Sequence, residues 1–239
     1  TTADVNLFVD PTGNDSNPCT AAGTSACLTL QGAFNKSPKD LRHRLIINVA
    51  TGNYAGVGIF GFTIYPAFQQ TTAGILIEGA LANITPTTST ATGTATAGTA
   101  GSTTTFGTLT DSGKAWTVND PAIVGKLVSI TGGTGSGQVR VVVSNTATVL
   151  TIAGTWTAPT GTSTYALQAP SSIITSPAPV IPGPLTANGS SVAGIQIAGD
   201  SSYASRIVVR NMGITVGSSI PIYMSGALLA EFQQVVTSG

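Results

Sequence analysis

Short runs of aliphatic residues, separated by corners rich in Gly, Ser, Asn and Pro, recur along most of this chain. Runs of this kind predict short strands, and the corners between them predict turns. In the C-terminal part, similar runs begin at Ile195 and at Ile222, about two dozen residues apart, and a second similar pair begins at Asn211 and at Phe232. A repeat of this length is typical of a solenoid, in which stacked coils bury one continuous core.

The N-terminal part has the same short strands and one helix. Strands are predicted at 5–9, 45–50, 57–62 and 75–79. Thr29 is a suitable N-cap for the helix, and Pro38 ends it. The apolar stripe of this helix is predicted to consist of Leu28, Leu30, Ala33 and Phe34.

The middle of the chain differs in composition from both ends. Residues 85–102 are almost wholly Thr, Ala, Gly and Ser, which predicts a linker or an exposed ribbon. Residues 103–168 contain strand-like runs about ten residues apart, which favours antiparallel hairpins in a small barrel or sandwich. We therefore divide the chain into an N-terminal segment 1–84, a linker 85–102, a β module 103–168 and a C-terminal segment 169–239.

Three N-terminal motifs carry a resemblance to a known fold family. They read LFVDPTGND at 7–15, CLTLQGA at 27–33 and IINVATGNY at 46–54. This order of strand, turn, helix and strand resembles the N-terminal cap of pectin-lyase-like right-handed parallel β-helix proteins of the phage tailspike or extracellular surface type. The likeness covers about 5–80 and 190–239. It implies an all-β, right-handed parallel β-helix with an N-terminal cap helix.

A second resemblance concerns the middle of the chain. Its motifs read LTDSGKAW at 109–116 and GGTGSGQ at 132–138, and Trp156 follows. They resemble a small β module that recurs in phage tails and other extracellular particles, which implies an insertion between early coils of the solenoid. Neither resemblance selects an activity, because β-helix proteins serve as lyases, glycosidases, tailspikes and adhesins.

Charge and hydropathy exclude several functional classes. Only 8% of the residues are charged, and 9 Lys and Arg are balanced by 9 Asp and Glu. Nucleic-acid binding requires many more cations, so we expect no nucleic-acid partner. No apolar run reaches the length of a membrane span. The first residues read as a mature or boundary end, and the last coil reads as one that continues or is completed by another subunit, so we expect self-association, with a trimer as a plausible form.

The two cysteines, Cys19 and Cys27, lie in one short loop. They can close a disulfide, which would indicate an extracellular setting, or they can remain as thiols. A zinc site is not expected, because zinc requires several ligands and His43 is the only histidine. We expect no cofactor.

Candidate chemistry is sparse. Glycan hydrolysis needs two carboxylates at one groove, and the acids in the predicted coils are Glu78, Asp200 and Glu231. Lyase chemistry would draw on Arg206 and Arg210, which have even spacing on one predicted strand. Calcium, which prefers oxygen ligands, would draw on the turn residues Asp10, Asn14, Asp15 and Asn17. The same Asx residues are also what turns require.

Two further groups allow both a binding and a structural interpretation. The basic residues Lys36, Lys39, Arg42, His43 and Arg44 could dock an anionic glycan, lipid or protein, or could form a solvated cap surface. The rings of Trp116, Trp156 and Tyr165 could bind glycans if they were exposed, and we expect them to be buried.

These observations favour a structural or adhesive component of an extracellular particle, such as a phage tailspike, a tail fibre or a secreted surface filament. Contact with surface polysaccharide is part of this hypothesis, and catalysis is not expected. The alternative is a polysaccharide lyase or glycoside hydrolase on the same scaffold.

Overall fold

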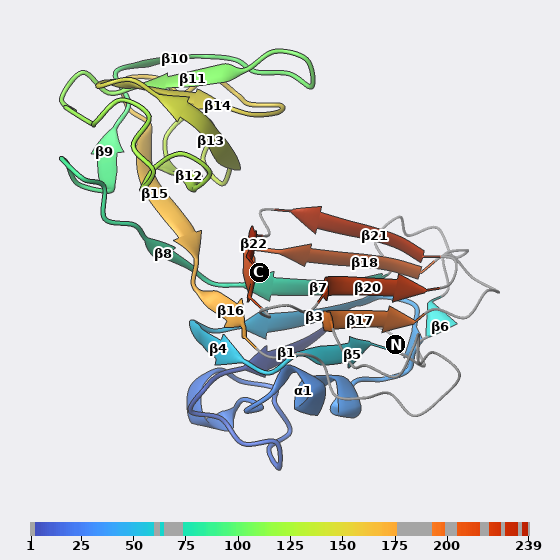
Figure 1. The fold of residues 1–239 in the computed structure, drawn as a ribbon. Coiled ribbons are helices and arrows are strands. Elements are labelled where there is room, and N and C mark those ends of the chain that lie inside the picture. The colour runs from blue at the N-terminus through green and yellow to red at the C-terminus, as the bar shows by residue number, and fades with distance from the viewer. Residues whose placement is uncertain are drawn as a thin grey trace. The chain divides into compact units, whose positions relative to one another are not determined.

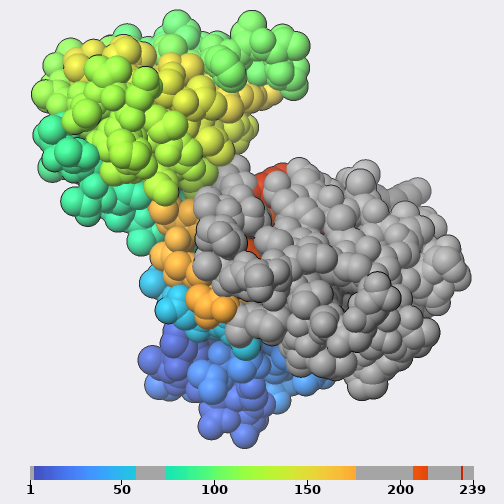
Figure 2. Space-filling model, in the orientation of Figure 1, coloured from blue at the N-terminus to red at the C-terminus, as the bar shows by residue number. Residues whose placement is uncertain are grey.

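The computed structural model describes residues 3–59, 63–64, 74–175, 193–198, 205–215, 220–225, 228–233 and 236–238. The chain divides into two compact units (Figure 1). Unit 1 consists of Thr1–Leu81 and Pro170–Gly239, and unit 2 consists of Ala82–Ala169. Each unit has its own hydrophobic core. Figure 2 shows N-terminal residues of unit 1 in blue and the surface of unit 2 in green to yellow.

Unit 1 is built from parallel strands in three main sheets. The first sheet has the order β1 (Val5–Val9), β3 (Arg44–Val49), β7 (Gly74–Gly79), β18 (Ser205–Arg210) and β21 (Leu228–Gln233). The second has the order β22 (Val236–Ser238), β19 (Met212–Thr215), β16 (Ser172–Ile174) and β4 (Gly52–Tyr54). The third has the order β20 (Ile220–Ser225), β17 (Ala193–Ala198) and β5 (Val57–Ile59). A short parallel pair joins β2 (Asp40–Leu41) and β6 (Thr63–Ile64).

The chain enters the three sheets repeatedly in one cyclic order. It passes from β3 to β4 and β5, then from β7 to β16 and β17, from β18 to β19 and β20, and finally from β21 to β22. Within each sheet, a strand pairs in parallel with the strand that the chain forms when it next enters that sheet. Examples are β3 with β7, β4 with β16 and β5 with β17. Successive passages therefore stack side by side, as Figure 1 shows for β3, β7, β18 and β21.

The register tests the predicted repeats. Ile195 pairs with Ile222, which confirms the first predicted pair of equivalent runs. The second predicted pair was wrong, because Phe232 pairs with Val209 and not with Asn211. Phe232 lies 23 residues after its true partner Val209. This repeat is two residues longer than the predicted repeat between Asn211 and Phe232.

The core of unit 1 lies between the sheets and beneath one short helix. Buried residues alternate with half-buried ones along β3 and β7, because successive side chains of a strand point to opposite faces. The helix α1 (Leu30–Lys36) packs Leu30, Ala33 and Phe34 into this core. As predicted, Thr29 is the N-cap, and its side chain accepts a hydrogen bond from the Gly32 amide at 2.9 Å. Leu28 does not belong to the buried stripe, because it precedes the N-cap and is 45% exposed.

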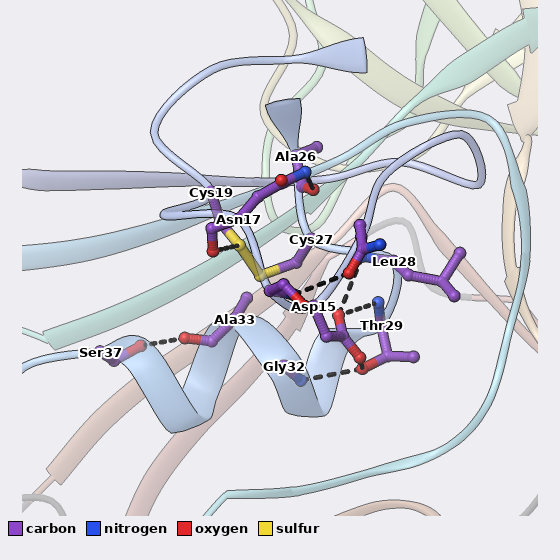
Figure 3. The surroundings of a disulfide bond; sticks show 12 residues. Asp15, Asn17, Cys19, Ala26, Cys27, Leu28, Thr29, Gly32, Ala33 and Ser37 are labelled. Carbon is purple, nitrogen blue, oxygen red and sulfur yellow. Dashed lines mark hydrogen bonds between the residues drawn. A yellow bond between two sulfur atoms is a disulfide. The ribbon is translucent and has the colours of Figure 1, made fainter. Parts of the chain in front are cut away.

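A loop that includes the 3₁₀ turn η1 (Gly23–Ser25) links β1 to α1, and one disulfide and one carboxylate hold it (Figure 3). Cys19 and Cys27 form the predicted disulfide, and both are fully buried. The Asp15 carboxylate accepts hydrogen bonds from the amides of Leu28 and Thr29, each at 2.9 Å. Gly32 faces this carboxylate so closely that a Cβ atom there would overlap it. The start of α1 therefore depends on a hydrogen bond that only glycine leaves room for.

Unit 2 is an antiparallel sheet, as the spacing of its runs predicted. Its strands are β8 (Leu81–Asn83), β9 (Thr92–Thr94), β10 (Ala97–Thr99), β11 (Gly107–Thr110), β12 (Leu127–Gly132), β13 (Val139–Asn145), β14 (Val149–Ile152) and β15 (Thr164–Pro170). Their order is β10-β11-β14-β13-β12-β15-β8, with β9 also paired to β15. Residues 85–102, for which a linker or exposed ribbon is predicted, supply β9 and β10 to this sheet.

A closed barrel, one of the two forms predicted for the module, is not what the structure shows. The strand order of unit 2 has two ends, and in the described residues β10 and β8 do not pair with each other. Both strands are only three residues long, and β8 shares its partner β15 with β9. Short end strands of this kind leave little backbone with which to close a barrel.

The chain leaves unit 1 and returns to it at adjoining positions. The Ser171 amide donates to the Ala80 carbonyl at 2.9 Å, and the Ala80 amide donates to the Ser172 hydroxyl at 2.8 Å. The buried Ser172 hydroxyl donates in turn to the backbone of β3, at the Val49 carbonyl. The sequence between Ala80 and Ser171 is therefore inserted between β7 and β16, two strands of the parallel sheets of unit 1.

Candidate functional site

A row of polar and aromatic side chains crosses the outer face of the first sheet of unit 1. The row follows the strand register and consists of Phe8, Asn48, Glu78, Arg210 and Gln233. Each of these residues is half-buried, whereas the residues that follow the first three of them, Val9, Val49 and Gly79, are buried. The strand alternation thus sends one side chain per strand to this row.

An ion pair lies in the middle of the row. Arg210 Nη2 donates to Glu78 Oε2 at 2.7 Å, and the two side chains are 38% and 33% exposed. A pair with this exposure contributes at most about 1 kcal/mol to stability. Beside it, Asn48 Nδ2 donates to the Leu7 carbonyl at 3.3 Å. Asn48 lies opposite Glu78 in the register of β3 and β7, on the same outer face.

One end of the row forms the floor of a groove of about 260 Å³. Its lining consists of Phe8, Val9, Asp10, Ala22, Asn48, Val49, Ala50, Glu78, Gly79 and Ala80. The only charged residues among these are Asp10 and Glu78. The groove therefore combines one aromatic ring, one amide and two carboxylates on a base of small residues.

Asp10 is held in its charged form at neutral pH. Its Oδ1 accepts hydrogen bonds from the Thr12 hydroxyl at 2.7 Å and from the Thr12 amide at 2.9 Å. These bonds hold the pKa of Asp10 below its usual value, with the hydroxyl bond as the largest cause. Asp10 is thus unsuited to donate a proton. Both carboxylates are well suited to accept hydrogen bonds from hydroxyl groups.

The predicted carboxylate set is described only in part. Glu78 lies in the groove, and Asp200 lies outside the described residues. The backbone of Glu231 lies in β21 and pairs with Val208, which pairs with Leu76. This register places Glu231 two strands away from Glu78 and two residues along, which corresponds to roughly 11–12 Å between Cα atoms. The groove instead places Asp10, one of the candidate calcium ligands or turn residues, in one site with Glu78.

The predicted arginine pair is likewise described only in part. Arg206 and Arg210 both lie on β18, and the side chain of Arg206 is outside the described part of the structure. Arg210 is engaged with Glu78, so the guanidinium group faces a carboxylate and not an open site.

The calcium candidates serve as local hydrogen-bond acceptors. Asp10 binds Thr12, Asn14 Oδ1 accepts from the Ser16 amide, and Asp15 binds Leu28 and Thr29. The Asn17 amide donates to the carbonyls of Thr24 and Ala26. Within the described ranges, no three His, Cys, Asp or Glu side chains gather as a metal site. Calcium binding at this loop stays a prediction.

The predicted basic group is largely engaged in the fold of the cap. Arg44 binds Asp4 through its backbone amide and two guanidinium nitrogens, at 2.9–3.0 Å. The first of these bonds is the main cause that lowers the pKa of Asp4. Lys39 Nζ donates to the Phe34 carbonyl at 3.0 Å, and partial burial lowers the pKa of Lys39. These contacts favour the structural interpretation of the basic residues.

The aromatic residues of unit 2 do not form a ligand platform. Trp116, Trp156 and Tyr165 are at most 2% exposed, which confirms the prediction that they are buried. Tyr165 packs edge-to-face on Trp116, with ring centroids 6.4 Å apart, and its hydroxyl donates to Asp111 Oδ2 at 2.8 Å. Glycan binding through these rings is therefore excluded.

Phe8 and Asn48 are residues of the candidate site that the sequence did not indicate. Phe8 occupies an outward position of the first predicted strand, and Asn48 interrupts an otherwise aliphatic run, Leu45–Val49. A polar residue within such a run marks an outward position once the strand alternation is applied. The pairing of Phe8, Asn48 and Glu78 follows from register, which the sequence alone did not supply.

Comparisons with known proteins return tailspikes. The tailspike protein gp49 of Pseudomonas phage LKA1 is 13% identical, with a TM-score of 0.26, over 78% of this chain and 28% of the tailspike. The Gp54 tailspike of Acinetobacter baumannii bacteriophage AP22, solved with A. baumannii capsular saccharide, is 10% identical, with a TM-score of 0.24, over 72% of this chain and 41% of the tailspike. This chain thus spans less than half the length of either tailspike. No protein-family model and no curated protein sequence matches it.

Among the described residues, no helix has the length and apolar character that crossing a bilayer requires.

Proposed function

We propose that this chain is a structural and adhesive part of an extracellular particle, of the tailspike or tail-fibre kind, and that its groove contacts surface saccharides. The groove of unit 1 is the single observation that carries the adhesive part of this proposal. Carboxylate and amide oxygens can accept hydrogen bonds from sugar hydroxyls, and an aromatic ring offers an apolar face. The residue types in the groove match these requirements.

The scaffold we propose is a right-handed parallel β-helix. Three parallel sheets entered in a fixed cyclic order are the arrangement that such a helix needs. Crossovers between parallel strands are right-handed in nearly all proteins, which supports the proposed hand. Stacked coils form a rigid support for an exposed site, because each coil is paired on both sides.

An extracellular location and self-association belong to the same proposal. The buried Cys19–Cys27 disulfide supports an oxidising environment. We propose a homotrimer as the assembled form. Analytical ultracentrifugation of the native chain at several concentrations tests this, and a purely monomeric species at all concentrations would reject it.

A saccharide-binding experiment tests the adhesive role. The intact chain is applied to an array of bacterial surface polysaccharides, beside the variants N48A and N53A. Asn48 lies in the groove, whereas Asn53 is an exposed residue of β4 in another sheet and serves as the matched control. We expect binding by the parent chain and by N53A. We expect at least about tenfold weaker binding by N48A, because the hydrogen bond between the Asn48 side chain and the sugar is lost. Equal binding by both variants would remove the groove from the proposal.

A polysaccharide-degrading enzyme is the second candidate, and the pairing of Asp10 and Glu78 in one groove is the observation that favours it. Hydrolysis requires two carboxylates across one bond. Incubation of the array-positive polysaccharide with the chain, followed by assays for reducing ends and for unsaturated sugars, separates the possibilities. Reducing ends that disappear in E78Q would establish hydrolysis, and unsaturated ends would establish a lyase.

A further inference from the structure

The charge of the groove limits which sugars it can accept. Among its lining residues, the carboxylates of Asp10 and Glu78 are the only charged groups. Hydrogen bonds from Thr12 keep the Asp10 carboxylate charged at neutral pH. The nearest cation in the row, Arg210, is bound to Glu78 at 2.7 Å. Because Arg210 offsets the charge of Glu78, Asp10 leaves the groove and its neighbouring ion pair with a net negative charge.

We propose that this groove selects a sugar residue that carries no anionic group, and that it disfavours uronic, phosphorylated and sulfated sugars. This inference rests on the proposed saccharide-binding function and specifies the ligand class of the same site. A carboxylate on the ligand would meet like charge in a groove whose lining residues include no cation, and such repulsion is how interfaces exclude wrong partners. Ring hydroxyls, in contrast, can donate to both carboxylates.

The size of the groove agrees with recognition of a short part of a saccharide. Its volume of about 260 Å³ lies just below the range of roughly 300–1,000 Å³ of pockets for drug-sized ligands. The ring of Phe8 and the small side chains of Ala22 and Ala80 border the same space. The groove therefore has room for about one sugar residue, which places the selection at a single position of a longer chain.

Matched neutral and acidic oligosaccharides test the inference. The pair consists of α-1,4-galacturonan oligosaccharides and their carboxyl-reduced derivatives of equal length, which differ only at C6, where a hydroxymethyl group replaces the carboxylate. Binding is measured by isothermal titration calorimetry on the intact chain, with a polysaccharide from the array as a further probe. We expect the neutral member of a pair to bind at least about tenfold more tightly.

The variant E78Q makes the test specific to the groove. It removes one negative charge and leaves Arg210 without its carboxylate partner. We expect the tenfold preference to shrink to within about threefold, through a gain in binding of the acidic sugar. D4N is the matched control, because Asp4 forms an ion pair with Arg44 elsewhere in unit 1. Circular dichroism verifies that both variants are folded.

The outcomes separate the inference from the function on which it rests. Equal or tighter binding of the acidic sugar by the parent chain, lost in N48A, would overturn the selectivity and leave saccharide binding intact. A preference for neutral sugars that persists unchanged in E78Q would also overturn it, because the charge would not be its cause. Failure of the parent chain to bind any saccharide on the array would reject the proposed function itself.

Discussion

The Asp15 carboxylate holds both the backbone and the side chain of Thr29. Its Oδ1 accepts from the Thr29 amide at 2.9 Å, and its Oδ2 accepts from the Thr29 hydroxyl at 2.8 Å. Thr29 Oγ1 in turn accepts from the Gly32 amide. A single side chain from the preceding loop therefore holds Thr29, the N-cap of α1, in place, as Figure 3 shows.

Replacement of Asp15 by alanine should destabilise the cap of unit 1. The change removes the acceptor of the Leu28 and Thr29 amides, and the expected loss is about 1–3 kcal/mol in the free energy of unfolding. Hydrogen exchange of the α1 amides measures the loss locally. D15N is the control, since its amide oxygen can still accept from both backbone amides, which share Oδ1 in the parent chain, and it should be affected less. Identical protection in D15A and the parent chain would contradict this prediction.

Removal of the disulfide should weaken the same cap. The Cys19–Cys27 bond closes a loop of sequence separation 8, for which chain entropy predicts a contribution of about 2–3 kcal/mol. The double variant C19S/C27S should show faster exchange in the cap and in β1. Reductant should have the same effect on the parent chain and none on the double variant. A cap whose exchange is insensitive to reductant would show that the bond adds no stability.

A methyl group at Gly79 should destabilise unit 1. A Cβ atom at this position would overlap the backbone carbonyl of Asn211, which belongs to the next coil and cannot rotate away. The expected loss for G79A is about 1–3 kcal/mol, typical of overpacking. G161A is the comparison, because a Cβ atom there would have its nearest neighbours at 3.7 Å, and its effect should stay within about 0.5 kcal/mol. Urea titrations of the three proteins decide between these expectations.

Acid should destabilise unit 2 through Asp120. Burial tends to raise the pKa of this carboxylate, but hydrogen bonds from Thr87 and from the Ala122 amide hold it below the usual 3.8. The unfolded state then binds a proton more readily than the folded state, so stability is complete above about pH 5 and falls as the pH drops below about 4. Tryptophan fluorescence follows this unit alone, because both tryptophans of the chain, Trp116 and Trp156, lie in it.

The variant D120N provides the control for the acid effect. It should be less stable than the parent chain at pH 7, because the amide cannot replace every bond that the carboxylate accepts. Between pH 5 and pH 3 its urea midpoint should change less than that of the parent chain. Parallel pH dependence of the two proteins would assign the acid effect to other carboxylates.

Deletion of unit 2 should leave the folded structure of unit 1 intact. The hydrogen bonds of Ala80 to Ser171 and Ser172 hold the two ends of the insertion together, and the two hydrophobic cores share no residue. We expect a chain in which a short Gly-Asn turn replaces 82–169 to keep its hydrogen-exchange protection in β3 and β7. The isolated segment 82–169 should unfold cooperatively by fluorescence. Loss of protection in β3 would show that the coils need the inserted unit.

Much of the local structure follows from the sequence because its causes are local. The N-cap at Thr29, the strand at Val5–Val9 and the disulfide each depend on residues close together in the chain. The antiparallel hairpins β12–β13 and β13–β14 of unit 2 also follow, since turn residues separate runs of suitable length. The equivalence of Ile195 and Ile222 was visible because both begin runs of similar residues.

The site was less predictable because it depends on register between distant strands. Phe8, Asn48 and Glu78 share a row only because β1, β3 and β7 pair without a shift. The repeat between Val209 and Phe232 was misjudged by two residues, and an error of that size misplaces every pair along the strand. Whether a module closes into a barrel depends on its end strands, which contribute little sequence signal.

The alternation along β3 and β7 separates two kinds of evolutionary constraint. Inward residues such as Ile47 and Ile77 are buried in the core. Asn48 and Glu78, one position further along each strand, line the groove. Substitutions on the outer row can change the exposed surface of the sheet while the packing of the core is unchanged. Because each strand contributes one position to the row, this surface can be altered one strand at a time at little risk to folding.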